Sequence, residues 1–289
     1  MRSFRFAVYT NNSDRADDWA AFALRAEELG YAALYVTDHL SHQLAPPVAL
    51  AAAAAVTRTL RIGPYVLASD FRHPLIVARE AATLDRLSGG RLELGLGAGW
   101  NRRDYRQLGL PYDAAGTRID RMLESLDVIR RLLSGQEVTH SGRFYQLDRA
   151  RVHPAPVQRP HPPIMLGAGG PRMVRIAARE AQIVSLVPQF SASGRPMVRH
   201  ATEAALERRA AMIRTAAGAR FEDLELNVFV ADAGMVGGSQ PLTASANAFV
   251  RSGGPPLIGG SPYLLYGTAS GLEQAMLRRR DRTGVTSYG

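Results

Sequence analysis

The sequence predicts an α/β fold of the (β/α)₈ TIM-barrel class, and three observations support this. Short apolar runs bounded by Gly, Pro or Asp alternate with longer stretches of helical period, which indicates βαβ units around a parallel sheet. The chain has 289 residues, of which 46% are hydrophobic, and this suits one barrel better than two average domains. Two stretches, at about 136–161 and 233–261, break the alternation as insertions. We therefore expect a single domain over residues 1–289.

The strands are expected where apolar residues run without helical spacing. Seven such segments are Arg5–Thr10, Ala33–His39, Arg61–Ser69, Arg91–Gly97, Pro163–Gly167, Gln182–Val187 and Glu225–Ala231. An eighth strand is indicated by Val285–Tyr288, just before the sequence stops at Gly289. Only Gly289 follows it in this sequence, so we expect a barrel that lacks the usual final helix.

Helices are expected where apolar residues recur every three or four positions and a glycine follows. Asp14–Leu29 shows this spacing and is stopped by Gly30. Further helices are expected at Pro74–Leu87, Asp120–Leu133, Ser270–Arg282 and after Arg172. The first insertion contains a hairpin-like segment, Val138–Leu147, and a proline-rich tail, whereas the second is rich in Gly, Ser and Pro. Long loops at the carboxyl face of a barrel are where substrates are selected.

The composition excludes several classes of function. Without cysteine the chain has no disulfides, thiolate zinc sites or cysteine nucleophiles, and we expect a cytoplasmic protein. The net charge is +9, but all 35 basic residues are arginines scattered among Asp and Glu, so we expect no nucleic-acid partner. We expect neither a signal peptide nor a membrane partner, because no apolar stretch is long enough.

Two polar pairs stand at the predicted ends of strands, where barrel enzymes carry their chemistry. Asp38 and His39 end the second strand, and His39 could donate a hydrogen bond to a ring system or exchange a proton near neutral pH. Equally, the two residues could simply cap the following turn. Arg72 and His73 precede a helix that Pro74 opens, and they could favour an anion. The alternative is that Arg72 pairs with Asp70 or Glu80.

Two glycine-rich segments suggest contacts with a ligand. Gly95, Gly97 and Gly99 end the fourth strand, and their missing Cβ atoms would let a planar or bulky group approach the backbone. Their spacing does not match a dinucleotide-binding fingerprint. The loop Gly167–Arg172 leads into a helix and could offer backbone N–H groups to a phosphate, with Arg172 as counter-charge. A tight strand-to-helix turn would also explain its glycines.

Other chemistries have weaker support. We expect no metal, because His39 and His42 are a poor substitute for the ligand set of a barrel hydrolase. Glycosidase chemistry needs two carboxyl groups at strand ends, and only Asp38 qualifies clearly. The sequence contains neither a Gly-x-Ser-x-Gly elbow nor a Walker loop. A bound cofactor that supplies the reactive atom is the remaining possibility.

Five segments together resemble the luciferase-like monooxygenase superfamily, most closely its actinobacterial oxidoreductases that depend on the deazaflavin coenzyme F420. They are TDHL at 37–40, TLRIG at 59–63, FRHP at 71–74, ATLDRLSGGRLELGLGAGW at 82–100 and QRPHPPIMLGAGGPR at 158–172. The resemblance covers essentially the whole chain. It implies F420 as cofactor, with FMN as the alternative, because the two share a ring shape and a ribityl phosphate.

The resemblance also implies roles for individual residues. His39 would lie against the cofactor ring with Asp38 beside it, and Trp100 would complete the catalytic set. The backbone from Tyr65 to Ser69 would form a bulge, often with a non-prolyl cis peptide, under one ring face. The remaining cofactor-binding residues would be Val66, Leu67 and Ala68 in the bulge, Gly97, Ala98 and Gly99 beside the ring, and Gly167, Ala168, Gly169, Gly170 and Arg172 at the phosphate.

Three functions follow from the resemblance. The first is F420-dependent hydride transfer to or from a small organic substrate. The second is an FMN-dependent monooxygenase that uses oxygen and reduced flavin from a separate reductase, and the third is an inactive cofactor-binding barrel. Some relatives carry a glutamate acid where this chain has Trp100-Asn101, so the proton donor is unassigned; the nearest acid is Asp104. We expect a homodimer.

Overall fold

The computed structural model describes residues 3–10, 17–189, 197–235 and 261–289. By their contacts the residues divide into two compact units, which are considered separately. The first unit is Phe6–Leu166, and the second is Met1–Arg5 with Gly167–Gly289. No helix in the described ranges is both long and apolar enough to cross a membrane.

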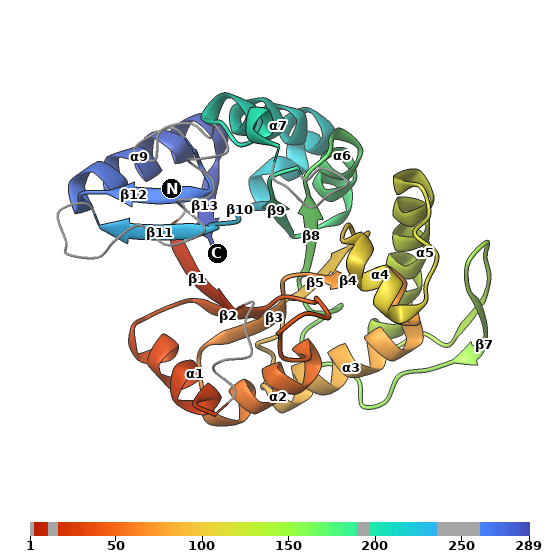
Figure 1. Ribbon diagram of the computed structural model, residues 1–289. Coiled ribbons are helices and arrows are strands. Elements are labelled where there is room, and N and C mark those ends of the chain that lie inside the picture. Colours follow the sequence, from red (N-terminus) through yellow and green to blue (C-terminus); the bar gives the residue numbers. More distant parts are fainter. Residues whose placement is uncertain (1–2, 11–16, 190–196, 236–260) are drawn as a thin grey trace. The chain divides into compact units, whose positions relative to one another are not determined.

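The first unit is a parallel sheet covered by helices (Figure 1). Strands β1, β2 and β3 pair in that order, and β4, β5 and β8 pair in that order, with a bridge from Ile62 to Leu92 between β3 and the start of the β5 segment. The strands are β1 Arg5–Thr10, β2 Ala33–Val36, β3 Arg61–Pro64, β4 Leu67–Ala68, β5 Leu94–Gly97 and β8 Ile164–Ala168, of which β8 enters the second unit at Gly167.

The helices of the first unit are α1 Trp19–Glu28, α2 Pro46–Val56, α3 Pro74–Leu87, α4 Arg102–Leu108 and α5 Ala115–Leu133, and a 3₁₀ turn, η1, covers Ser69–Phe71. Among these helices, α1 packs against α2, α2 against α3, and α3 against α5. Every residue of β2 and of β5 is buried, as expected for parallel strands covered on both faces. Helix α3 begins at Pro74, as predicted, and buries one apolar face that includes Val77, Ala78 and Ala81.

The second unit is built in the same way. Strands β9 Ile183–Leu186, β10 Glu225–Val228 and β13 Val285–Tyr288 form parallel pairs with β10 in the middle. The β13 strand is the predicted eighth strand. The helices are α6 Pro171–Glu180, α7 Glu203–Ala217 and α9 Ala269–Thr283, with 3₁₀ turns η2 Val198–His200 and η3 Gly218–Asp223. A separate parallel pair joins β11 Asp232–Met235 to β12 Leu264–Gly267.

The first insertion contains the predicted hairpin. Strands β6 Val138–Ser141 and β7 Gln146–Ala150 pair antiparallel. The tip of the hairpin is held by Glu124 of α5, which accepts hydrogen bonds from the backbone N–H groups of Arg143, Phe144 and Tyr145. The hairpin thus follows helix α5 and leads into strand β8. It is therefore not a loop that leaves the carboxyl end of a strand. Most of the second insertion, residues 236–260, lies outside the described residues.

Candidate functional site

Asp38 follows β2 and is almost fully buried, with 6% of its surface exposed. Its carboxylate accepts two hydrogen bonds from Arg72, at 2.6 and 2.9 Å, and one from the backbone N–H of Ala68, at 3.0 Å. Arg72 therefore pairs with Asp38, and the predicted pairing with Asp70 is wrong. The Asp38 oxygens already accept hydrogen bonds from Ala68 of β4 and from Arg72. Asp38 therefore holds the backbone of β4 in place and does not cap the turn after β2.

The backbone between β3 and β4 forms the bulge that the family resemblance implied. Its Tyr65–Val66 peptide bond is cis. The Tyr65 ring stacks on Tyr35, with ring centroids 5.0 Å apart.

The glycines of β5 are explained by this bulge. A Cβ atom on Gly95 would lie 2.1 Å from the carbonyl oxygen of Pro64, and one on Gly97 would lie 2.7 Å from a methyl group of Val66. The group that approaches the backbone at these two positions is therefore the neighbouring strand. The expectation that their missing Cβ atoms make room for a planar ligand is corrected accordingly.

His39 and Asp104 form a close pair. His39 Nδ1 lies 2.7 Å from Asp104 Oδ2, and the Asp104 side chain is 1% exposed whereas that of His39 is 24% exposed. Asp104 Oδ1 also accepts a long hydrogen bond of 3.4 Å from the backbone N–H of Leu40. The His39 ring meets the Trp100 ring edge-on, with centroids 5.3 Å apart. The structure thus brings together His39 and Trp100, two of the predicted catalytic residues, and adds a buried acid.

The segment that carries Trp100 is supported from below by aromatic and arginine side chains. Gly99 has a φ of +70°, and a Cβ atom there would lie 2.2 Å from the Tyr105 hydroxyl. That hydroxyl donates to Asp70 at 2.9 Å, while Arg118 donates to the Ala98 carbonyl at 3.3 Å. Burial raises the pKa of Tyr105, and the neighbouring Asp70 raises it further, so the phenol stays protonated and remains a donor.

From the sequence, Asp104 was recognisable only as the nearest acid, and Tyr105 and Arg118 were not identified. One signal was present. Asn101 is an N-cap residue whose side chain accepts from the Arg103 N–H, so it starts α4 and places Asp104 and Tyr105 in the first helical turn after Trp100.

The predicted phosphate loop belongs to the second unit. Helix α6 begins at Pro171, and its N-cap residue, Gly170, provides no side-chain cap. A Cβ atom on Gly169 would meet its nearest neighbours at 3.5 Å, and one on Gly170 would meet only Gln189, at 3.9 Å. Protein contacts at these distances do not require either glycine. A helix start without a side-chain cap fits an anion such as a phosphate.

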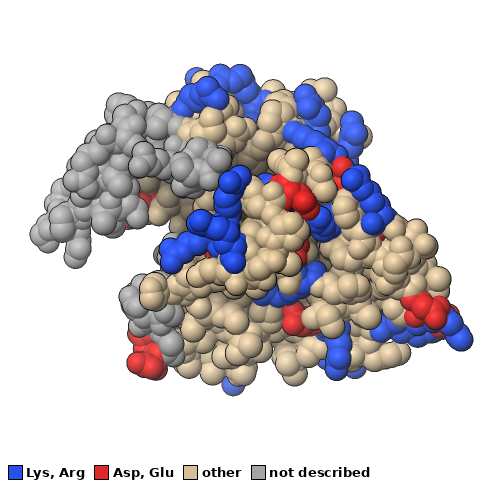
Figure 2. Space-filling view, turned by 45° about the vertical axis from the view of Figure 1, so that its right-hand side comes forward, with Lys and Arg blue, Asp and Glu red and all other residues tan. Residues whose placement is uncertain are grey.

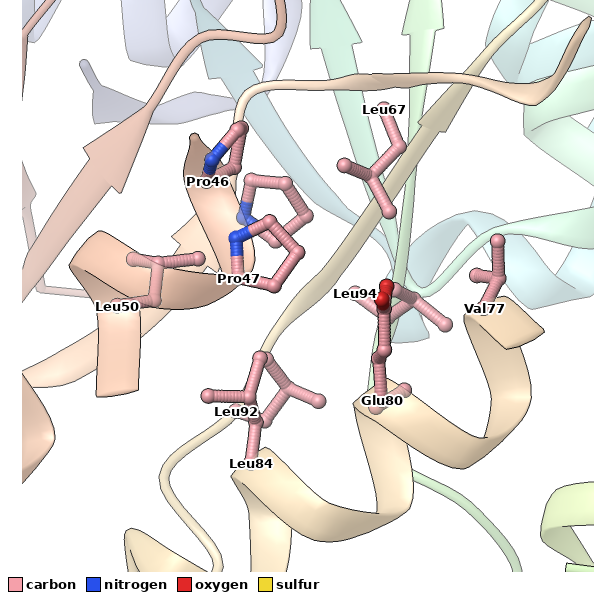
Figure 3. A pocket seen from close by; sticks show the side chains of 11 residues that line it. Pro46, Pro47, Leu50, Leu67, Val77, Glu80, Leu84, Leu92 and Leu94 are labelled. Atoms are coloured by element: carbon pink, nitrogen blue, oxygen red, sulfur yellow. The ribbon is translucent and has the colours of Figure 1, made fainter. Parts of the chain in front are cut away.

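A small apolar cavity of the first unit is lined in part by Pro64 and Leu67, which flank the cis-linked Tyr65 and Val66 of the bulge (Figure 3). Glu80 of α3 stands among its aliphatic side chains, which include Val77, Leu84 and Leu94, and its Oε2 atom is buried without a hydrogen-bond partner. Burial holds the pKa of Glu80 above its ordinary value; the charge of Arg72 opposes this shift and that of Asp38 adds to it.

In the described part of the chain the charged groups do not form a metal centre, and the face seen in Figure 2 carries no single basic patch. No group of three or more His, Cys, Asp or Glu side chains in the described part of the chain is arranged to hold a metal ion. On the face seen in Figure 2, arginines are spread out, with acidic side chains between them.

Comparison with known proteins identifies the family. The model of the luciferase-like monooxygenase family matches residues 1–229. The chain belongs to this family. Members of this family include F420-dependent dehydrogenases and FMN-dependent monooxygenases.

Curated relatives include F420-dependent glucose-6-phosphate dehydrogenases. That of Microbacterium testaceum is 35% identical over 169 residues, which are 56% of this chain and 49% of that protein. That of Nakamurella multipartita is 34% identical over 170 residues, again 56% of this chain and 49% of the relative. The chain thus spans about half the length of the curated relatives it matches.

Solved structures confirm the fold class. A monooxygenase from Streptomyces bottropensis superimposes with a TM-score of 0.81 at 23% identity, covering 99% of this chain and 91% of that one. An F420-dependent secondary alcohol dehydrogenase in complex with an F420–acetone adduct gives a TM-score of 0.79 at 18% identity, covering 99% and 92%. At these identities the likeness establishes the luciferase-like TIM-barrel fold alone.

Proposed function

We propose that the protein is an F420-dependent oxidoreductase that transfers a hydride to or from a small organic substrate with a hydroxyl or carbonyl group. The main observation that supports this proposal is the arrangement of His39. Its ring is partly exposed, stands edge-on to Trp100 and is hydrogen-bonded to the buried Asp104. This site has a proton-transfer group but no nucleophile of its own, which suits chemistry carried by a cofactor. The F420-dependent relatives support the choice of cofactor and substrate class.

Residues of the first unit would hold the cofactor ring. The bulge at Val66, Leu67 and Ala68 is anchored by Asp38 and would support the ring, together with the Gly97–Trp100 segment. In the second unit, the loop Gly167–Arg172 leads into α6 without a side-chain cap and could bind a phosphate. When bound, the deazaflavin supplies the carbon that gives or accepts the hydride.

The chain's own residues would handle the proton and the surroundings. With Nδ1 held by Asp104, His39 can take a proton from a substrate hydroxyl at Nε2, or return one to a carbonyl. Trp100, which is 38% exposed, would shield the ring contact from water. Asp38 would act by holding the bulge, because Arg72 and Ala68 occupy its oxygens.

A binding titration tests the proposal. Oxidised F420, reduced F420 and FMN are added in turn to the purified chain, and cofactor fluorescence is followed. We expect F420 to bind in preference to FMN, and Gly169→Asp to weaken that binding at least about tenfold because its carboxylate repels the phosphate. Ala269→Asp is the matched control, since it adds the same charge to the exposed start of α9 in the same unit and should leave binding unchanged.

His39→Ala separates binding from chemistry. We expect this variant to keep its affinity for F420 and to lose about 100-fold or more in turnover. Preference for FMN together with substrate-dependent oxygen uptake would instead support the monooxygenase alternative. Failure to bind either cofactor would overturn the proposal.

A further inference from the structure

The pairing of His39 with Asp104 determines which ring nitrogen carries the hydrogen. A carboxylate can only accept hydrogen bonds, so at 2.7 Å from Asp104 Oδ2 the Nδ1 atom must be the protonated nitrogen. In the neutral ring Nε2 is then left with a free lone pair. Asp104 is 1% exposed, so little water competes for this hydrogen bond.

The surroundings of His39 keep the ring in one orientation. The backbone N–H of His39 donates to the Gln43 side chain at 3.2 Å, and the ring stands at 82° to the Trp100 ring. The other nearby carboxylate, Asp38, is occupied by Arg72 and by the Ala68 N–H. Among the described residues, Asp104 is therefore the acid that contacts the imidazole.

We propose that Asp104 is a positioning residue that holds the hydrogen of His39 on Nδ1, so that Nε2 is the proton acceptor of the site. Its role in turnover rests on the function proposed above, whereas its effect on the tautomer does not. In the oxidation of an alcohol, bound oxidised F420 would supply the acceptor for the hydride of the C–H bond, and Nε2 would take the proton of the O–H bond. The carbon–oxygen double bond forms as both leave, and the carboxylate of Asp104 stabilises the imidazolium produced.

Asp104→Asn makes the opposite tautomer favourable. The backbone N–H of Leu40 can only donate, so it would draw the amide oxygen of the new side chain. The amide NH₂ would then face Nδ1 and turn it into an acceptor, which moves the hydrogen to Nε2. An Nε2 that carries its hydrogen in the neutral ring cannot accept a proton from an alcohol.

The tautomer can be measured without cofactor by ¹H–¹⁵N correlation spectra of histidine-labelled protein, at a pH where the imidazole is neutral. The His39 signals are assigned by their absence in His39→Ala. We expect the Nδ1–H form in the wild type and the Nε2–H form in Asp104→Asn. The same Nε2–H form in both proteins, or the Nδ1–H form in both, would overturn the proposal.

Glu124→Gln is the matched control, because Glu124 holds another histidine of the same unit, with Oε1 3.1 Å from His140 Nε2. It should change the His140 signals and leave those of His39 unchanged. In alcohol oxidation, Asp104→Asn should lower kcat about 100-fold or more, with KM and F420 affinity little changed. If F420 does not bind at all, the proposed function fails while the tautomer result still stands; a shifted tautomer with unchanged kcat would overturn the catalytic role of Asp104.

Discussion

At the scale of single residues, Arg72 and Asp38 of the first unit form a largely buried ion pair. Arg72 and Asp38 have side chains that are 21% and 4% exposed, and their two hydrogen bonds form a bidentate pair. Such a pair adds little net stability compared with apolar packing, but a single buried charge left behind is costly. The pair therefore constrains the bulge more than it stabilises the fold.

Removing one member tests this view. We expect Arg72→Ala to lower the free energy of unfolding by about 3 kcal/mol, since it leaves the Asp38 carboxylate buried and unpaired. Arg282→Ala removes an exposed pair with Glu207 and should cost less than about 1 kcal/mol. Urea unfolding measures both variants. Equal losses would show that Asp38 does not depend on Arg72.

The partner of Arg72 also shows where inference from sequence stops. The sequence offered Asp70 or Glu80 as the partner of Arg72, yet the hydrogen-bonded partner is Asp38, at the end of a different strand. Likewise, Asp104 was recognisable as the nearest acid, but its contact with His39 joins residues 65 positions apart. Residue types at strand ends were predictable, whereas their pairing depends on long-range strand register.

At the scale of elements, Glu27 joins α1 to the turn that leads into β3. Its carboxylate accepts from the backbone N–H groups of Arg58, Thr59 and Leu60 and from the Thr59 hydroxyl. Burial alone would raise the pKa of Glu27, but these hydrogen bonds outweigh it and lower the pKa from 4.5 to about 2.

The lowered pKa predicts a pH-dependent stability. A carboxyl whose folded pKa is depressed stabilises the fold above its unfolded pKa, and this stability is lost as the pH falls from 4.5 through about 2. We expect Glu27→Gln to cost about 1 kcal/mol at pH 7, a modest value because solvent screens the site. The difference from the wild type should shrink towards zero near pH 2. Thermal unfolding at a series of pH values measures it; a difference independent of pH would exclude this linkage.

Elements were predictable where capping residues and periodicity agreed. Helix α3 has its predicted bounds, since Pro74 opens it and Ser88-Gly89-Gly90 ends it. Helix α5 begins at Ala115, five residues before the predicted start. The prediction missed its first turn because Ala115-Gly116-Thr117 lacks apolar spacing. Helix α2 was not predicted, since its alanine-rich sequence shows no polar face. Strand β2 ends at Val36, where Thr37 turns to hydrogen-bond Gln43.

At the scale of the whole molecule, the second unit depends on a strand that is far from its partner in the sequence. All four residues of β13 are buried, and β13 pairs with β10. A row of polar side chains crosses strands β9, β10 and β13, with Asn227 accepting from Ser185 and donating to Ser287, each at 3.1 Å. Buried polar rows of this kind favour one strand register over others.

Shortening the chain tests how much the second unit depends on β13. We expect deletion of residues 285–289 to abolish cooperative unfolding of the second unit, because it uncovers β10 and removes the buried Val285 and Tyr288 side chains. Ser287→Ala keeps the strand but leaves the Asn227 amide without this partner, so it should cost about 1 to 3 kcal/mol and preserve the fold. Limited proteolysis followed by mass spectrometry distinguishes the two variants. Cleavage at sites within the second unit, on the carboxyl side of Gly167, should become rapid only in the shortened chain. If the shortened chain resists proteolysis as the wild type does, the second unit holds together without β13, and its stability resides in β9, β10 and their helices.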